Sequence, residues 1–301
     1  MTPHTPSAAP RPGPTDDMPR AMAWMVASGL SFALMGAMVK FAGDVPLPAK
    51  VFFRNLVTLV ITLGVAVRAG TSPFAPTPHW RRLLARAGAG LLGVLLYFQA
   101  IEHLHLADAS LLNKTSPFFV LVFAVLFLGE RLGRSQVPVL MLAFAGALLV
   151  IRPRFDTTML PALAGLGSGL FAGLAYVLVR SLKGREGPNR IILTFSLVSC
   201  LAMAPFLVAA PPRPTPGQWL ALAGTGVFAA GGQYGLTFAY HHARASRISV
   251  FTYLHVLFAM VLGFVFFDER PDALSLLGGA LIVIAAVATG RIARREDERS
   301  A

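Results

Sequence analysis

The chain contains little charge and almost no cysteine. Only 13% of its 301 residues are charged, whereas a soluble domain carries about 25%. The single cysteine, Cys200, lies within an apolar run, so a disulfide within the chain and a cysteine-based metal site are both excluded. Asp and Glu are missing from the middles of the apolar runs, which disfavours a carboxylate proton relay inside a membrane.

Long apolar runs are abundant. The chain is 55% hydrophobic, its mean hydropathy is +0.65, and apolar runs of about 20 residues, the length that crosses a bilayer, recur from residue 21 to residue 290. This pattern predicts an all-α polytopic membrane protein. We expect ten transmembrane helices, at about 21–42, 48–68, 83–103, 106–129, 134–152, 159–181, 190–210, 218–241, 246–267 and 272–291.

The two ends of the chain are polar. Residues 1–20 carry six prolines, which predicts a disordered cytoplasmic tail. Asp16 and Asp17 precede the first apolar run, so we interpret that run as a retained helix and not as a signal peptide. Residues 292–301 are expected to form a second cytoplasmic tail.

The basic residues predict the orientation of the chain. If both termini are cytoplasmic, eighteen of the 26 Lys and Arg residues lie inside and six outside, as the positive-inside rule requires. The net charge of +12 therefore reflects topology and does not indicate nucleic-acid binding. We expect a multi-pass protein of the bacterial inner membrane, acting as a monomer or a weak dimer among lipids.

An internal repeat relates the two halves. "FLGER" ends at Arg131 and "FFDER" ends at Arg270, and the same offset of 139 residues aligns Ser110 with Ser249 and Phe119 with Phe258. Residues 21–152 and 159–291 thus form two five-helix units. Because five is odd, the second unit is inverted in the membrane, an arrangement typical of secondary transporters with a substrate site between the halves.

The F-x-x-E-R helix ends, together with "FFRN" at Phe52–Asn55, resemble the EamA-type transporters of the drug/metabolite transporter superfamily over about residues 21–291. The resemblance implies two inverted EamA-like repeats around a central cavity, and amino acid or metabolite export. Val256 stands where the first half has Pro117, so we expect only the first half's fourth helix to bend.

Polar stripes on the two fourth helices are the main candidate site. Ser110, Asn113, Lys114 and Pro117 share one helix face. The matched stripe holds Ser249, Thr252 and Tyr253, followed by His255. Lys114 either binds a substrate carboxylate, snorkels to the interface or makes a structural contact. We expect Lys114 and Tyr253 to face each other across the cavity.

The other candidates are polar or aromatic residues within the predicted spans. His255 either couples transport to protons or is a neutral, hydrogen-bonded histidine, and Arg54 either contacts substrate or anchors its helix at the interface. Glycines at small-residue spacing allow close helix contacts. The remaining substrate candidates are Tyr97, Gln99, Tyr176, Gln233 and Tyr234, and the spaced glycines are Gly165, Gly169 and Gly173.

Two functional classes compete. An enzyme is suggested by "EHLHLAD" (Glu102, His103, His105, Asp108) and by His241–His242, but the predicted topology puts these clusters on opposite sides, so they cannot share a metal ion. The absence of a phosphate-binding loop excludes ATP-driven transport by this chain alone. We expect no cofactor. The favoured function is export of an amino acid or similar amphipathic compound by alternating access, and the alternative is import or exchange of an anionic or nucleoside-like metabolite.

Overall fold

In the computed structural model, the described residues 17–70, 76–128, 136–151, 159–182, 185–242 and 249–300 fold into helices joined by short turns. The elements are α1 (Met18–Phe41), α2 (Leu47–Arg68), α3 (Trp80–His103), α4 (Leu106–Asn113), α5 (Ser116–Leu128), α6 (Gln136–Ile151), α7 (Leu160–Leu182), α8 (Pro188–Ala209), α9 (Pro216–His242), the 3-10 helix η2 (Ser249–Tyr253), α11 (Leu254–Phe267) and α12 (Ala273–Ser300).

Most helix boundaries agree with the apolar runs to within a few residues. The largest differences lie near the two ends of the chain. α1 begins at Met18 because Asp17 caps it, with its side chain accepting a hydrogen bond from the Arg20 amide at 3.3 Å. α12 continues as a helix to Ser300, although its apolar character ends about ten residues earlier.

The fourth predicted helix is broken in two. α4 ends at Asn113 and α5 begins at Ser116. Pro117 lies in the first turn of α5, where a missing amide hydrogen costs little, and its ring disfavours helical geometry for the preceding residue. The Thr115 hydroxyl donates to the Leu112 carbonyl at 2.6 Å, so a carbonyl freed at the end of α4 is satisfied.

The second half also departs from a regular α-helix near this level, which the sequence did not predict. The matched segment of the second half is the 3-10 helix η2, which changes to α-helix between Tyr253 and Leu254, although no proline is present. The Tyr253 hydroxyl donates to the Lys114 carbonyl at 3.1 Å. In the first half, Pro117 accounts for the irregular geometry. In the second half, this hydrogen bond to the first half accompanies it.

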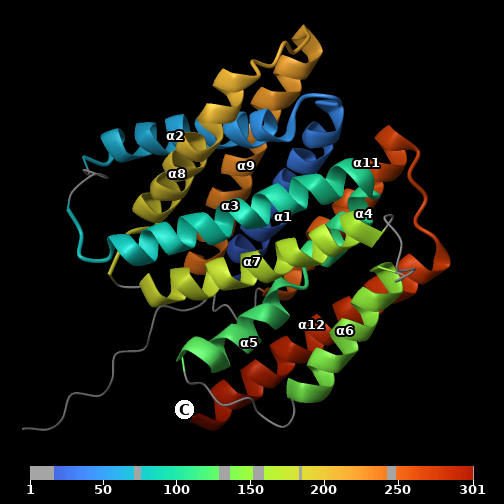
Figure 1. Cartoon of the computed structure of the whole chain (residues 1–301). Helices are drawn as coiled ribbons and strands as arrows, with labels where there is room; N and C mark the ends of the chain where they lie inside the picture. The colour runs from blue at the N-terminus through green and yellow to red at the C-terminus, as the bar shows by residue number, and fades with distance from the viewer. Residues whose placement is uncertain are drawn as a thin grey trace, which may run out of the picture.

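The helices pack in reciprocal pairs. α1 packs on α9 and α3 packs on α7, while α2 packs on α8 and α6 packs on α12. Figure 1 shows α3 and α7 crossing in front of α1 and α9, with α2 and α8 on one side and α6 and α12 on the other. The largest buried core joins α1, α2, α3, α8, α9 and α11, and a second core joins α4, α6 and α12.

Five of the described helices are long and apolar enough to cross a membrane. They are 19–41, 47–68, 80–103, 160–179 and 188–209, and shorter apolar helices cover 251–267 and 273–285. Large apolar side chains such as Val60, Val208 and Leu220 are exposed on this bundle. Such an outer surface is stable in a lipid environment and unfavourable in water.

We call the end of the bundle where α7 ends and α8 begins the Glu186 end. There the Thr77 hydroxyl donates to Glu186, and Arg190 Nη1 donates to Glu186 Oε2 at 2.8 Å. The Thr77 hydrogen bond, followed by the hydrogen bond and charge of Arg190, lowers the pKa of Glu186. These contacts link the segment before α3 to the start of α8.

Replacing Glu186 by glutamine is expected to flatten the acid limb of the stability profile. A carboxylate whose pKa is lowered in the folded state stabilises the fold above its unfolded pKa of about 4.3, and this stabilisation is lost as the pH falls through the folded pKa. The measurement is the thermal midpoint of the purified protein between pH 6 and pH 3. Asp44→Asn, at an exposed carboxylate, is the control and should keep the wild-type slope. If the stability of wild type and of Glu186→Gln falls equally with pH, the lowered pKa of Glu186 does not contribute to stability.

Candidate functional site

Lys114 lies at the break between α4 and α5, inside the bundle. Its side chain is half-buried, and its ammonium lies 5.8 Å from the centre of the Phe32 ring of α1, within the range of a cation–π interaction. Among the described residues no carboxylate forms an ion pair with it. The break places a cation against an aromatic face in the interior, where an unpaired charge is costly.

Tyr253 and His255 complete this site from the second half. The Tyr253 hydroxyl donates to the Lys114 carbonyl at 3.1 Å, so the two residues are in direct contact. From the sequence they were instead expected on opposite sides of a cavity. The His255 ring is 2% exposed and meets the Phe32 ring edge-on, with centroids 6.4 Å apart. Within the described part of the chain, neither ring nitrogen of His255 has a hydrogen-bond partner in good geometry.

The surrounding polar side chains hold the break in place. Asn113 Nδ2 donates to the Ser168 hydroxyl of α7 at 3.0 Å, and the Ser168 hydroxyl donates to the Gly165 carbonyl at 2.6 Å. On the other side, the hydroxyls of Tyr97 and Ser110 lie 3.1 Å apart. We call Lys114, Tyr253, His255 and Phe32 the central site.

The predicted close approach along α7 is confirmed. A Cβ atom added to Gly169 would lie 2.8 Å from the Leu112 carbonyl oxygen, and one added to Gly173 would lie 2.9 Å from the Ser116 carbonyl oxygen. One added to Gly165 would lie 2.8 Å from the Leu112 side chain. These glycines therefore let α7 contact the backbone of the break.

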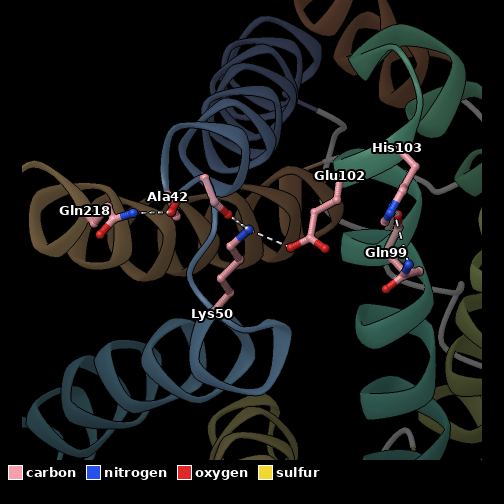
Figure 2. Close-up of polar contacts among 7 residues, drawn as sticks. Ala42, Lys50, Gln99, Glu102, His103 and Gln218 are labelled. Atoms are coloured by element: carbon pink, nitrogen blue, oxygen red, sulfur yellow. Dashed lines mark hydrogen bonds and ion pairs between the residues drawn. The ribbon is translucent and has the colours of Figure 1, made fainter. Parts of the chain in front are cut away.

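Several other predicted site residues have their described contacts outside the central site. Gln99 turns to His103, with Nε2 3.3 Å from Nδ1, as Figure 2 shows. Tyr234 of α9 stacks on Phe238, and Gln233 and Thr252 are half-buried. Tyr176 of α7 is 47% exposed. Arg54 packs on Phe195 of α8, 5.2 Å from the ring centre.

A network of ion pairs connects the helices at the opposite end of the bundle, which we call the Glu269 end. Lys40, at the end of α1, pairs with Glu269 and donates to the Leu104 carbonyl at 2.8 Å. The other carboxylate oxygen of Glu269 accepts the Leu106 amide at 2.6 Å. Asp268, at the end of α11, has a left-handed φ of 51°, and the Glu269 amide donates to the Gly263 carbonyl at 3.1 Å, so the left-handed residue turns the chain out of the helix. Three chain segments thus meet on one carboxylate.

Lys50 forms a second pair at the same end. Its side chain is only 1% exposed, and its ammonium donates to the Gly43 carbonyl at 2.7 Å and to Glu102 at 2.6 Å. Figure 2 shows this ammonium between the turn after α1 and the end of α3. Gln218 of α9 donates to the Ala42 carbonyl at 3.2 Å. The Glu269 end is therefore tied across α1, α2, α3, α9 and α11.

Several of these residues were not predicted. Phe32 was not among the site residues expected from the sequence, and Lys40, Lys50 and Arg86 entered only the count of basic residues that predicts the orientation. Ser168 lies between Gly167 and Gly169. This run of small residues is the only feature of the sequence that could have drawn attention to Ser168. The ion pairs join residues separated by 52 and 229 positions, so no local pattern could reveal them.

The contacts of the histidine-rich segment do not favour an enzyme. Glu102 binds Lys50 and His103 binds Gln99, while His105 lies 3.7 Å from Asp108. In the part of the chain that the structure describes, no group of three His, Cys, Asp or Glu residues is placed to hold a metal ion. The central site can bind a ligand through charge and aromatic surface, but it contains no nucleophile with an activating base.

Comparison with known proteins gives consistent relatives. The pseudopaline exporter CntI of Pseudomonas aeruginosa is 37% identical over 279 residues, covering 88% of this chain and 94% of the relative. A riboflavin transporter of Brucella anthropi is 30% identical over 269 residues, covering 86% and 94%. A protein of known crystal structure superposes with a TM-score of 0.67 at 19% identity, covering 91% of this chain and 98% of the other, which shows a shared fold.

The sequence profile of the EamA-like transporter family matches residues 19–152 and 159–291. These two ranges include all ten predicted spans. The bacterial relatives are named as transporters, which agrees with the long apolar helices. The chain is therefore a multi-pass membrane transporter, not an enzyme, and it belongs to the EamA-like transporter family within the drug/metabolite transporter superfamily.

Proposed function

We propose that this protein is a secondary transporter that exports an amino acid or a similar amphipathic carboxylate across the bacterial inner membrane. The observation that carries the proposal is the central site. The Lys114 ammonium, which has no carboxylate partner among the described residues, lies 5.8 Å from an aromatic ring centre, next to a buried tyrosine and a buried histidine. A cation beside an aromatic face suits a molecule with a carboxylate and an apolar part.

Alternating access between two inverted halves is part of the proposal. With the offset of 139 residues, α1, α3 and α4/α5 of the first half correspond to α7, α9 and α11 of the second. α1 packs on α9 and on α11, and α7 packs in return on α3, α4 and α5. This reciprocity supports two halves related by approximate twofold symmetry, which can exchange conformations.

Orientation follows from charge. The Glu186 end carries Arg81, Arg82, Arg185 and Arg190, so we propose that it faces the cytoplasm and that both termini do as well. The Glu269 end then faces outward, and its ion pairs close the outer side. Export is favoured because the relative that shares 37% identity is named an exporter.

The test is a counterflow assay in proteoliposomes over amino acids, organic acids and nucleosides, with and without a pH gradient. We expect counterflow of an amphipathic carboxylate. Lys114→Ala and Lys114→Met should each raise the apparent KM at least about tenfold, the loss expected when a charged hydrogen-bonding group is removed. Inserted, folded Lys114 variants with wild-type KM and rate would exclude the substrate-binding role of Lys114.

Import or exchange of an anionic or nucleoside-like metabolite is the second candidate. It is favoured by relatives from several bacteria that are named riboflavin transporters, one of them 30% identical to this chain. The same assay separates the two candidates, because counterflow of nucleoside-like compounds without counterflow of amino acids would support the second.

A further inference from the structure

Two arginines lie together in the interior, outside the central site. Arg54 of α2 is 3% exposed and Arg86 of α3 is 8% exposed. Their guanidinium carbons lie 5.2 and 4.5 Å from the centre of the same ring, that of Phe195 on α8. In Figure 1, α2 and α8 lie side by side and α3 passes close to α8. We call Arg54, Arg86 and Phe195 the arginine pair site.

The charges of this site are not compensated by the described residues. Arg54 Nη1 donates to the Asn55 side chain at 2.8 Å, but neither arginine forms an ion pair there. In the part of the chain that the structure describes, Arg54 Nε, Arg86 Nε and Arg86 Nη1 are buried donors without a partner. Ser199, which lies one turn beyond Phe195 on the same face of α8, also has a buried hydroxyl without a partner. Two like charges with unused donors are strongly unfavourable unless an anion joins them.

The position of the site separates it from the surface. Leu83 and Ile191 form a buried apolar cluster with Leu182. They precede Arg86 and Phe195 by one turn on the same faces of α3 and α8, on the side of the Glu186 end. An apolar layer thus lies between the arginine pair site and the Glu186 end. Because both guanidiniums are enclosed by protein, a lipid headgroup has poor access to them.

We propose that Arg54 and Arg86 bind the carboxylate group of a small organic anion, with the Phe195 ring contacting its apolar part. Guanidinium donors match a carboxylate in charge and geometry, and the Phe195 ring, which lies close to both guanidiniums, supplies an apolar surface. The site uses α2, α3 and α8, whereas the central site uses α1, the break between α4 and α5, η2 and α11, so it is a separate subsite. The inference rests on the proposed function only in taking this anion to be the transported molecule.

The test uses benzoate as the probe and benzamide, which has the same shape but no charge, as its control. The thermal midpoint of the purified full-length protein is measured at constant ionic strength. Benzoate should raise it by about 3 °C or more near saturation, and benzamide should not. Arg54→Gln and Arg86→Gln should each abolish the rise, and both variants should fold because each removes an uncompensated buried charge. Arg82→Gln, at an exposed arginine of α3, is the control variant and should keep the benzoate-induced rise of the thermal midpoint.

Three results would overturn the proposal. They are an equal benzoate shift in the Arg54→Gln/Arg86→Gln double variant, an equal shift with benzamide, and stabilisation by phosphatidylglycerol micelles but not by benzoate. The measurement does not depend on transport. A benzoate shift that requires both arginines, together with a negative counterflow screen, would contradict the proposed function and leave the anion site standing.

Discussion

Glu269→Gln is expected to destabilise the protein by about 3 kcal/mol, because breaking a buried ion pair leaves the remaining charge without a partner. The Glu269 residue is 8% exposed and its carboxylate accepts from both Lys40 and the Leu106 amide. Lys40 and the Leu106 amide bind different carboxylate oxygens, and glutamine places an NH2 group at one of these two positions, so one donor loses its acceptor and Lys40 loses its countercharge. The thermal midpoint of the purified protein and the rate of counterflow in proteoliposomes should both fall.

The neighbouring carboxylate provides a matched control. Asp268 and Arg270 form an ion pair at 3.5 Å with side chains 84% and 76% exposed. Asp268→Asn removes that charge and keeps a residue that tolerates left-handed backbone, so it should cost less than about 0.5 kcal/mol. If Glu269→Gln and Asp268→Asn melt at the same temperature, the Lys40–Glu269 pair does not hold this end of the bundle together.

Adding a single methyl group at Gly169 is expected to have the second large effect. A Cβ atom there would lie 2.5 Å from the Thr115 hydroxyl and 2.8 Å from the Leu112 carbonyl oxygen, and the carbonyl belongs to backbone that cannot rotate away. Gly169→Ala should therefore push α7 from the break, at a cost of about 2 kcal/mol. Because the break positions Lys114, transport should fall as well.

Gly88→Ala is the control, since a Cβ atom on Gly88 of α3 meets nothing within 4 Å. There the change should stabilise by about 0.5–1 kcal/mol, as alanine favours a helix over glycine. The change in thermal midpoint should therefore have opposite signs: a decrease for Gly169→Ala and an increase for Gly88→Ala. A stabilised Gly169→Ala variant would show that α7 does not contact the break as closely as described.

The helices could largely be predicted from the sequence. The length of each apolar run fixed nearly every boundary, because a bilayer of defined thickness selects runs of about 20 residues. Pro117 indicated a bend in the fourth helix, and the break at Lys114 and Thr115 is where that proline acts. The 3-10 segment Ser249–Tyr253 was missed, because it contains no proline or glycine to mark a break, and the modest helix propensities of its residues are common in buried helices.

The candidate site was predicted only in part. Lys114, Tyr253 and His255 were identified because polar residues in apolar helices are rare and follow one face. Their partners were not identified: the Phe32 ring beside Lys114, and the Ser168 hydroxyl that binds Asn113. A phenylalanine among many, or a serine among glycines, carries no signal of its own.

The sequence by itself determined that this is a polytopic helical protein, where its helices lie along the chain and that its halves are related. These properties depend on local composition, on charge between apolar runs and on a constant offset. Only the tertiary structure decided which buried charges meet. It paired Lys40 with Glu269 across 229 positions, and it left Arg54 and Arg86 together on Phe195. A helix that is apolar on nearly every side has no preferred face in its sequence, so its rotation and partners are set by packing against the other helices.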